Sequence, residues 1–226
     1  MISFSNSIIA LVLGYFLGSI PSAHWLAKYY YGINIFEHGS GNMGATNIYR
    51  VLGSRPFAIT LMLDIIKGFL AVLFISRLPH PAEIDIPIKI IAGSAAVAGH
   101  TLSFWVNFRG GKGVATALGV FLGIAPISSI CAMFVFLLVL VPSGYVSLSS
   151  MVSASSMPFF IMYFHEGGAN WYLPLAIFSS FVAVFLIIKH KNNIMKILSG
   201  KELSLRNKPS PSSDPVPDPT ENKMVK

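Results

Sequence analysis

Two glycine-rich polar stretches interrupt an otherwise apolar chain, and their residue types suit anion binding. The first runs from Gly39 to Arg50 and reads Gly-Ser-Gly-Asn-Met-Gly-Ala-Thr-Asn-Ile-Tyr-Arg. Its glycines let backbone N–H groups converge on one small ligand, and Arg50 can bind that ligand with two parallel hydrogen bonds. We therefore interpret the stretch as a phosphate-binding segment and prefer this to a plain surface turn. The residues that we expect to contact the ligand are Gly39, Ser40, Gly41, Asn42, Gly44, Thr46, Asn47 and Arg50.

The second stretch, residues 109–113, reads Arg-Gly-Gly-Lys-Gly and leads directly into a predicted helix. Free N–H groups at a helix start, the positive end of the helix dipole and a lysine together favour an anion. The pattern is not a Walker A loop, because that motif requires glycine where this chain has Val106 and a hydroxyl residue where it has Gly113, so no nucleotide–magnesium site is expected. The alternative is a positively charged membrane anchor whose glycines serve helix packing. We prefer an anion site, with contacts from Gly110, Gly111, Lys112 and Gly113.

Further polar side chains lie near the ends of the apolar segments. The serines after Pro142 have no histidine and carboxylate at a triad-like spacing, and no Gly-x-Ser-x-Gly elbow occurs, so a serine-nucleophile hydrolase is not expected. Their hydroxyls either donate to a ligand or cap the next helix. His190, Asn193 and Lys196 share a helix face, which suits a substrate or an interfacial helix on anionic lipid. The candidate substrate contacts from these groups are His100, Ser147, Ser150, His190 and Asn193.

The composition indicates what kind of chain positions these residues. Of 226 residues, 54% are hydrophobic and 11% are charged, and the mean hydropathy is +0.66. A soluble domain is charged at about a quarter of its positions, so we predict an all-α, polytopic integral membrane protein. Eight of the sixteen lysines and arginines lie from Lys189 onward, which indicates a cytoplasmic tail facing lipid headgroups and not nucleic-acid binding. The single cysteine, Cys131, excludes an internal disulfide and a cysteine-based metal cluster, and no metal site is expected.

We expect about seven transmembrane helices. The apolar segments that would contain them are residues 5–30, 56–77, 88–106, 114–141, 151–164 and 171–188. If the polar stretches and the tail meet at one site, an even number of crossings separates them, so residues 114–141 must hold two short helices broken near Pro126. This places the N-terminus outside and both the active site and the C-terminus on the cytoplasmic face, where most basic residues fall. Residues 1–203 would form the transmembrane domain, and residues 204–226 a disordered proline-rich tail.

Several residues within the spans have a predictable structural role. Gly14 and Gly18 are spaced for close contact with another helix, and Pro21 is expected to kink the first span. Asp64 and Lys67 share one face of the second span. Because a lone charge in a membrane is costly, we expect these two to pair or to face the bundle interior, either as a structural ion pair or in support of the site.

One spacing resembles a catalytic motif that we do not expect to be functional here. His80 and Asp85 fit the His-x4-Asp pattern of a large acyltransferase group. They fall in a proline-rich loop that the predicted topology places on the membrane face opposite the other polar motifs. We therefore interpret this spacing as coincidence.

An ordered series of motifs extends over residues 10–203. The motifs are Gly39-Ser40-Gly41-Asn42-x-Gly44-Ala45-Thr46-Asn47-x-x-Arg50, Gly99-His100, Gly110-Gly111-Lys112-Gly113-Val114-Ala115-Thr116, Ser147-Leu148-Ser149-Ser150, and His190-x-x-Asn193-Ile194 with Gly200 and Glu202. In this series the chain resembles the bacterial acyl-phosphate:glycerol-3-phosphate acyltransferase family. Lys191 departs from the resemblance, since the family often has arginine there; the charge is kept but the bidentate geometry is not.

The resemblance implies transfer of an acyl chain from acyl phosphate to the sn-1 hydroxyl of glycerol 3-phosphate in phospholipid biosynthesis. The products would be lysophosphatidic acid and inorganic phosphate, with neither acyl-CoA nor acyl carrier protein as donor and with no cofactor. It further implies a multi-pass protein of the bacterial cytoplasmic (inner) membrane that contacts membrane lipid and acts with a soluble acyl-phosphate-forming enzyme. It assigns roles in activity to Ser40, Arg50, Lys112, His190 and Asn193, and a structural role to Glu202.

Two questions stay open at this level. The general base is either His190 or a phosphate oxygen of the acyl phosphate itself; we favour the second, with His190 and Asn193 orienting glycerol 3-phosphate. The alternative function is a membrane transporter for organic phosphates, but such proteins usually contain paired repeats, and this chain shows no convincing repeat. A lipid phosphotransferase would need carboxylates for magnesium, which Asp64 alone does not provide.

Overall fold

The computed structural model describes residues 4–79 and 81–205, and within these ranges the regular structure is entirely helical. The α-helices are α1 (Phe4–Ser19), α2 (Ser22–Tyr31), α3 (Ala45–Leu52), α4 (Ser54–Ile75), α5 (Asp85–Thr101), α6 (Val114–Ile124), α7 (Pro126–Ser143), α8 (Val146–Phe164), α9 (Tyr172–Lys189) and α10 (Lys191–Leu198). Short 3₁₀ helices cover Ile35–Glu37, Ala82–Ile84 and Phe104–Val106. In these described ranges, five segments are long and apolar enough to cross a membrane: Ser5–Tyr31, which joins α1 to α2, and the helices α4, α7, α8 and α9. The predicted all-α architecture is confirmed.

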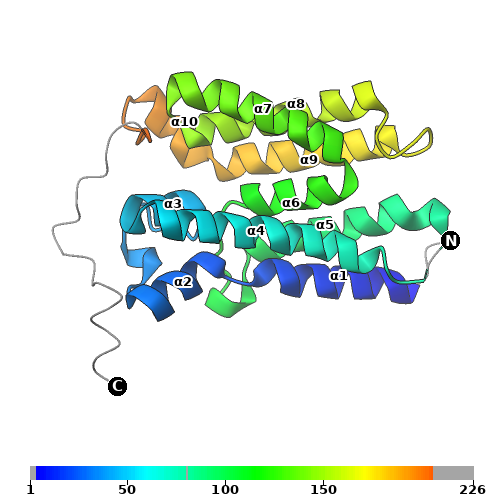
Figure 1. Cartoon of the computed structure of the whole chain (residues 1–226), viewed down its shortest axis with the longest axis horizontal. Helices are drawn as coiled ribbons and strands as arrows, with labels where there is room; N and C mark the ends of the chain where they lie inside the picture. The colour runs from blue at the N-terminus through cyan, green and yellow to red at the C-terminus, as the bar shows by residue number, and fades with distance from the viewer. Residues whose placement is uncertain (1–3, 80, 206–226) are drawn as a thin grey trace.

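The long helices lie side by side in two groups, as Figure 1 shows. One group contains α1, α2, α4 and α5, the other contains α7, α8 and α9, and α6 lies between them. The short helices α3 and α10 lie at the same end of the molecule. The polar stretches that lead into these short helices are therefore gathered at one end of the bundle.

Helices α1 and α5 approach closely because α1 has glycines at the contact. A Cβ atom on Gly18 would lie 2.0 Å from the carbonyl oxygen of Ala96, and one on Gly14 would lie 2.3 Å from that of Ala92. Any larger side chain at these positions would push the two helices apart. The close helix contact predicted from the Gly-x-x-x-Gly spacing is confirmed.

Prolines divide two of the predicted spans. The first span is broken, not merely kinked, because α1 ends at Ser19 and α2 begins at Ser22, directly after Pro21. In the segment 114–141, Pro126 begins α7 directly after the end of α6. Proline suits the first turn of a helix because its missing N–H has no partner there in any case. The predicted division of this segment into two helices is confirmed.

The span predicted at residues 151–164 begins earlier than expected, because α8 starts at Val146 and takes in the polar serines. Serine disfavours helices when its hydroxyl competes for backbone groups elsewhere. Here Ser149 Oγ donates to the carbonyl oxygen of Tyr145 and Ser150 Oγ to that of Val146, both at 2.8 Å. Because these hydroxyls bond to carbonyl oxygens one turn earlier in the chain, the serines fit within the helix.

Asp64 and Lys67 form the expected pair inside the bundle. The Lys67 Nζ atom lies 2.8 Å from Asp64 Oδ1, and both side chains are buried. Lys67 Nζ also donates at 2.8 Å to the carbonyl oxygen of Ile20, at the break between α1 and α2. The pair thus links α4 to the point where the first span changes direction. Asp64 in addition lines the cavity described below.

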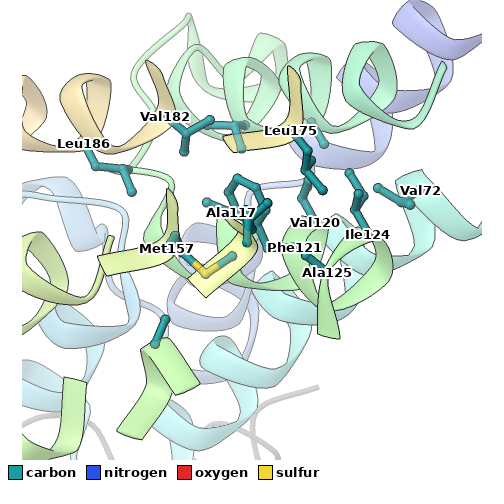
Figure 2. Packing of buried hydrophobic residues seen from close by; sticks show 14 of the residues in the cluster. Val72, Ala117, Val120, Phe121, Ile124, Ala125, Met157, Leu175, Val182 and Leu186 are labelled. Carbon is teal, nitrogen blue, oxygen red and sulfur yellow. The ribbon is translucent and has the colours of Figure 1, made fainter. Parts of the chain in front are cut away.

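The main hydrophobic cluster surrounds α6. Figure 2 shows Val120, Phe121 and Ile124 of α6 among Val72 of α4 and Leu175 of α9, all of them buried. With eleven residues, α6 is too short to be stable through its own hydrogen bonds alone. Burial of its apolar side chains on several sides stabilises it. Its first turn, which follows the second glycine-rich stretch, is therefore held at a defined position.

The packed body continues beyond the predicted domain boundary at residue 203. The backbone N–H of Leu205 donates to the carbonyl oxygen of Gly144 at 2.9 Å, so residues 204 and 205 lie with the body. The remainder of the predicted tail, residues 206–226, lies outside the described residues, and so does His80. Asp85, the other half of the His-x4-Asp spacing, begins α5 and pairs with Lys89 at 2.6 Å.

Candidate active site

A cavity of about 760 Å³ lies between the two groups of helices, a volume typical of small-molecule sites. Its polar end is formed by α3 and the loop before it, by the start of α6, and by the α9–α10 junction with the segment that follows α10. Its body is lined by apolar residues of α4, α6, α7, α8 and α9. The five residues predicted to act in catalysis all line this cavity: Ser40, Arg50, Lys112, His190 and Asn193.

The loop before α3 is held by the side chain of Asn47. Its Oδ1 accepts from the backbone N–H of Ser40 at 2.7 Å, and its Nδ2 donates to the carbonyl oxygens of His38 at 3.0 Å and Ile35 at 3.3 Å. Gly39 lies in the left-handed region with φ +61°, and a Cβ atom there would meet Asn47 Oδ1 at 2.3 Å. Asn47 therefore positions Ser40 by using its own hydrogen-bonding groups within the protein. Gly39, Ser40, Asn42, Gly44, Thr46 and Asn47 all line the cavity, as predicted for ligand contacts.

Three of the predicted glycine contacts do not line the cavity: Gly41, Gly110 and Gly111. The backbone N–H of Gly111 donates to the carbonyl oxygen of His100 at 3.1 Å, and a Cβ atom on Gly111 would lie 2.2 Å from His100 Nε2. The N–H of Gly41 donates to the carbonyl oxygen of His38 at 3.0 Å. In these positions glycine permits the chain to approach other protein atoms. Gly113, in contrast, lines the cavity at the start of α6, with φ +91°.

Lys112 is the first member of a hydrogen-bonded chain at the polar end. Its Nζ donates to Asn193 Oδ1 at 2.6 Å, Asn193 Nδ2 donates to Glu202 Oε1 at 2.7 Å, and Ser147 Oγ donates to the same Glu202 oxygen at 2.8 Å. Glu202 thereby fixes which end of the Asn193 amide faces Lys112. Burial lowers the pKa of Lys112 to about 8, with Glu202 opposing the shift and the positive charge of Arg50 adding to it.

His190 is held in one neutral form. Its Nδ1 lies 2.8 Å from the carbonyl oxygen of Leu186, and because a carbonyl can only accept, Nδ1 carries the proton. Nε2 is then a free acceptor on a residue that lines the cavity. Burial and the nearby charge of Lys112 together lower the pKa of His190 to about 4. His190 is therefore an uncharged hydrogen-bond acceptor near neutral pH.

Arg50 connects α3 to the segment after α10. Its Nη2 donates to the carbonyl oxygen of Leu203 at 3.2 Å. Burial lowers the pKa of Arg50, and the charge of Glu202 partly opposes this shift, but a guanidinium stays charged at any physiological pH. The basic side chains that line the cavity are Arg50, Lys112, Lys189 and Lys196, against the carboxylates of Glu202 and of Asp64, which is already paired.

The remaining predicted contacts lie at the cavity with their polar groups already used or deeply buried. Ser147 donates to Glu202, and Ser150 donates to its own helix. Neither serine caps α8, because the residue before that helix is Tyr145, without a side-chain cap. His100 is buried beneath Gly111, with Nδ1 3.8 Å from Asp64 Oδ1. The sequence interpretation gave Glu202 a structural role only. Its place in the chain of hydrogen bonds to Lys112 could not be foreseen, because it joins residues from three separate segments.

The cavity combines a cationic end with an apolar body, and this combination suits an anionic group attached to an apolar chain. The family model described as glycerol-3-phosphate acyltransferase matches residues 8–200, and the chain belongs to this family. A glycerol-3-phosphate acyltransferase of Fusobacterium nucleatum is 40% identical over 192 residues, which cover 85% of this chain and 94% of that protein. One of Trichlorobacter lovleyi is 43% identical over 188 residues, with 83% and 92% covered. The family expected from the motifs is confirmed.

Solved structures agree with this assignment. The fold is similar to that of PlsY (YgiH), an integral membrane glycerol 3-phosphate acyltransferase, in crystal structures of its glycerol 3-phosphate form and its lysophosphatidic acid form. The TM-scores are 0.79 and 0.76 at 30% sequence identity, and the alignments cover 88% of this chain and 95% and 94% of the two solved chains. The chain is accordingly an integral membrane protein with several spans.

Proposed function

We propose that this protein transfers an acyl chain from acyl phosphate to the sn-1 hydroxyl of glycerol 3-phosphate. The products are lysophosphatidic acid and inorganic phosphate, and a soluble enzyme supplies the acyl phosphate. The observation that carries the proposal is the joining of Arg50, Lys112 and the first turn of α6 at one end of a cavity whose body is apolar. Family membership supports the same reaction class.

The two ends of the cavity suit the two parts of an acyl phosphate. The phosphate groups of both substrates meet the cations and the free N–H groups at the start of α6, where anions are stabilised. The acyl chain lies in the cavity body. Serines that line this body do not make it polar, because Ser129, Ser153 and Ser179 each donate to a backbone carbonyl oxygen at 2.6–2.8 Å.

The chemistry needs positioning and charge stabilisation more than a strong nucleophile, because an acyl phosphate is already activated. The sn-1 hydroxyl oxygen attacks the carbonyl carbon, the bond from that carbon to the phosphate oxygen breaks, and the hydroxyl proton passes to a phosphate oxygen of the departing group. Lys112 and Arg50 stabilise the negative charge that develops. His190, neutral and with Nε2 free, accepts the hydrogen bond that orients the hydroxyl, while Asn193 keeps Lys112 in place.

The reaction is tested with purified protein in detergent, supplied with palmitoyl phosphate and glycerol 3-phosphate. We expect equimolar lysophosphatidic acid and inorganic phosphate, with release of phosphate dependent on glycerol 3-phosphate. Palmitoyl-CoA and palmitoyl acyl carrier protein serve as control donors and should give no product. Product from either thioester, or uptake of glycerol 3-phosphate into proteoliposomes without phosphate release, would contradict the proposed donor or the proposed reaction.

We further propose seven crossings of the bacterial cytoplasmic membrane, with the N-terminus outside, the site and the C-terminus inside, and α6 and α7 as separate crossings. Lys112 precedes α6 and Ser147 follows α7, and both line the polar end of one cavity, so the chain leaves that end and returns to it between them. A cysteine at Ile127, introduced with Cys131→Ala, should react with a membrane-impermeant maleimide from outside. Protection of this cysteine in intact cells, with labelling after lysis, would favour five crossings.

A further inference from the structure

The apolar body of the cavity ends at one level in three helices. Going away from the polar end, the last lining residues are Phe121 on α6, Met157 on α8 and Ser179 on α9. One turn farther along the same helices, Ile124, Ile161 and Leu175 are buried in the hydrophobic cluster and do not line the cavity. The cavity is therefore closed by core packing at this level.

The floor of the cavity consists of the side chains of Phe121 and Met157, which pack against other protein atoms on the side away from the cavity. Phe121 and Met157 are 5% and 6% exposed, and the Phe121 ring packs on Phe178 with centroids 5.5 Å apart. Below Phe121 the chain ends α6, passes Ala125 and starts α7, so backbone covers the floor from beneath. In the view of Figure 2, Ile124, Ala125 and Leu175 are drawn on the side of Phe121 and Met157 that faces away from Leu186. Close packing of this kind does not yield easily to an extra methylene group.

The depth of the cavity body follows from helix geometry. Met157 is eleven positions after Val146 on α8, and Ser179 is eleven positions before His190 on α9. At the rise of an α-helix, each separation corresponds to roughly 16 Å along the axis. The width near the floor is set by small residues, since Ser129 and Ala132 of α7 and Ser179 of α9 line the cavity there.

We propose that Phe121 and Met157 form a floor that sets the longest acyl chain the enzyme accepts well. The inference rests on the proposed function, because it requires the acyl chain to lie in the cavity body. Each methylene that fits above the floor adds apolar burial and favours binding by about fourfold. A methylene beyond the available depth must bend the chain or displace packed core residues, so the gain stops at a defined length.

The test compares kcat/KM for a series of saturated acyl phosphates from dodecanoyl to octadecanoyl phosphate. Met157→Ala should lower the floor and shift the preferred chain toward greater length, raising the ratio of octadecanoyl to dodecanoyl activity by at least about fourfold. Ser179→Leu and Ala132→Leu should fill the lower cavity and shift the preference toward shorter chains. Met162→Ala is the matched control, because Met162 is an exposed methionine on the same helix that does not line the cavity; its profile should match that of the wild type.

The possible outcomes distinguish a failure of the proposed floor from a failure of the proposed reaction. Unchanged profiles in Met157→Ala and in both filling variants, with each protein eluting as a folded species in detergent, would overturn the role of the floor. An equal shift in Met162→Ala would also overturn it, because a methionine outside the cavity would then have the same effect. Failure of the wild-type protein with every acyl phosphate would instead refute the proposed donor. The two filling variants lie on different helices, so if one variant misfolds, the other still tests the role of the floor.

Discussion

Replacing Lys112 by methionine is expected to lower kcat/KM for acylation of glycerol 3-phosphate by about 100- to 1,000-fold, the usual cost of removing one group that stabilises developing charge. Lys112 is half-buried, donates to Asn193 and acts electrostatically on His190, and methionine keeps its apolar stem but removes the charge. Steady-state rates measured by phosphate release provide the comparison. The matched control is Lys191→Met, because Lys191 is exposed at the start of α10 and does not line the cavity. A loss of equal size in both variants would mean that the effect is not local to the site.

The same lysine should govern the pH dependence at the alkaline side. Burial lowers the pKa of Lys112 to about 8, so its charged form is present below that pH and is lost as the pH rises through it. Since kcat/KM reports ionisations of the free enzyme, it should fall above pH 8 in the wild type. Lys112→Arg keeps a charge at all these pH values and should remove this fall in whatever activity it retains.

The same pH series examines His190. With a pKa of about 4, His190 is uncharged throughout the accessible range and should add no ionisation near pH 6.5. Substrate phosphates ionise near pH 6, so an acidic limb is expected, and His190→Gln should leave its midpoint in place. An acidic limb that disappears in His190→Gln would show that the histidine itself gains and loses the proton during catalysis.

Arg50→Met is the second large effect that we expect, with a loss of about 10- to 100-fold in kcat/KM, the range for hydrogen bonds to a charged group. Arg50→Lys should recover only part of the activity, because an ammonium keeps the charge but not the two-point geometry for phosphate. The matched control is Arg55→Met, since Arg55 is exposed on the first turn of α4 and does not line the cavity.

Titration of each substrate in the Arg50 and Lys112 variants should show which phosphate each cation binds. A rise in KM confined to glycerol 3-phosphate in Arg50→Lys would assign its phosphate to α3. Arg50 also bonds to Leu203, so a variant could loosen the last segment of the chain. Such loosening would change both KM values together and would be accompanied by a lower unfolding temperature in detergent, whereas a binding role predicts one KM change at unchanged stability.

Much of the architecture followed from local chemistry alone. Long apolar runs specify membrane helices because every backbone polar group must be satisfied within lipid, and Pro126 divides one run because proline begins a helix more readily than it continues one. Two clusters of glycines with a nearby cation indicated anion binding, and Arg50, Lys112, His190 and Asn193 do meet at one cavity. The Asp64–Lys67 pair was likewise predictable, since two opposite charges on one buried helix face are stabilised most simply by pairing with each other.

Tertiary structure decided the features that depend on partners distant in the chain. Glycine signals close approach in any sequence, but only the fold shows that Gly113 borders the cavity while Gly111 lies against His100. The span predicted from residue 151 begins at Val146, because the hydroxyls of Ser149 and Ser150 donate to backbone carbonyl oxygens one turn earlier. Glu202 reaches Ser147 and Asn193 only because α8 and α10 are adjacent. The floor at Phe121 and Met157 exists because separate helices stop lining the cavity at the same depth. The sequence of one helix does not predict this depth, because it depends on how the helices pack against one another.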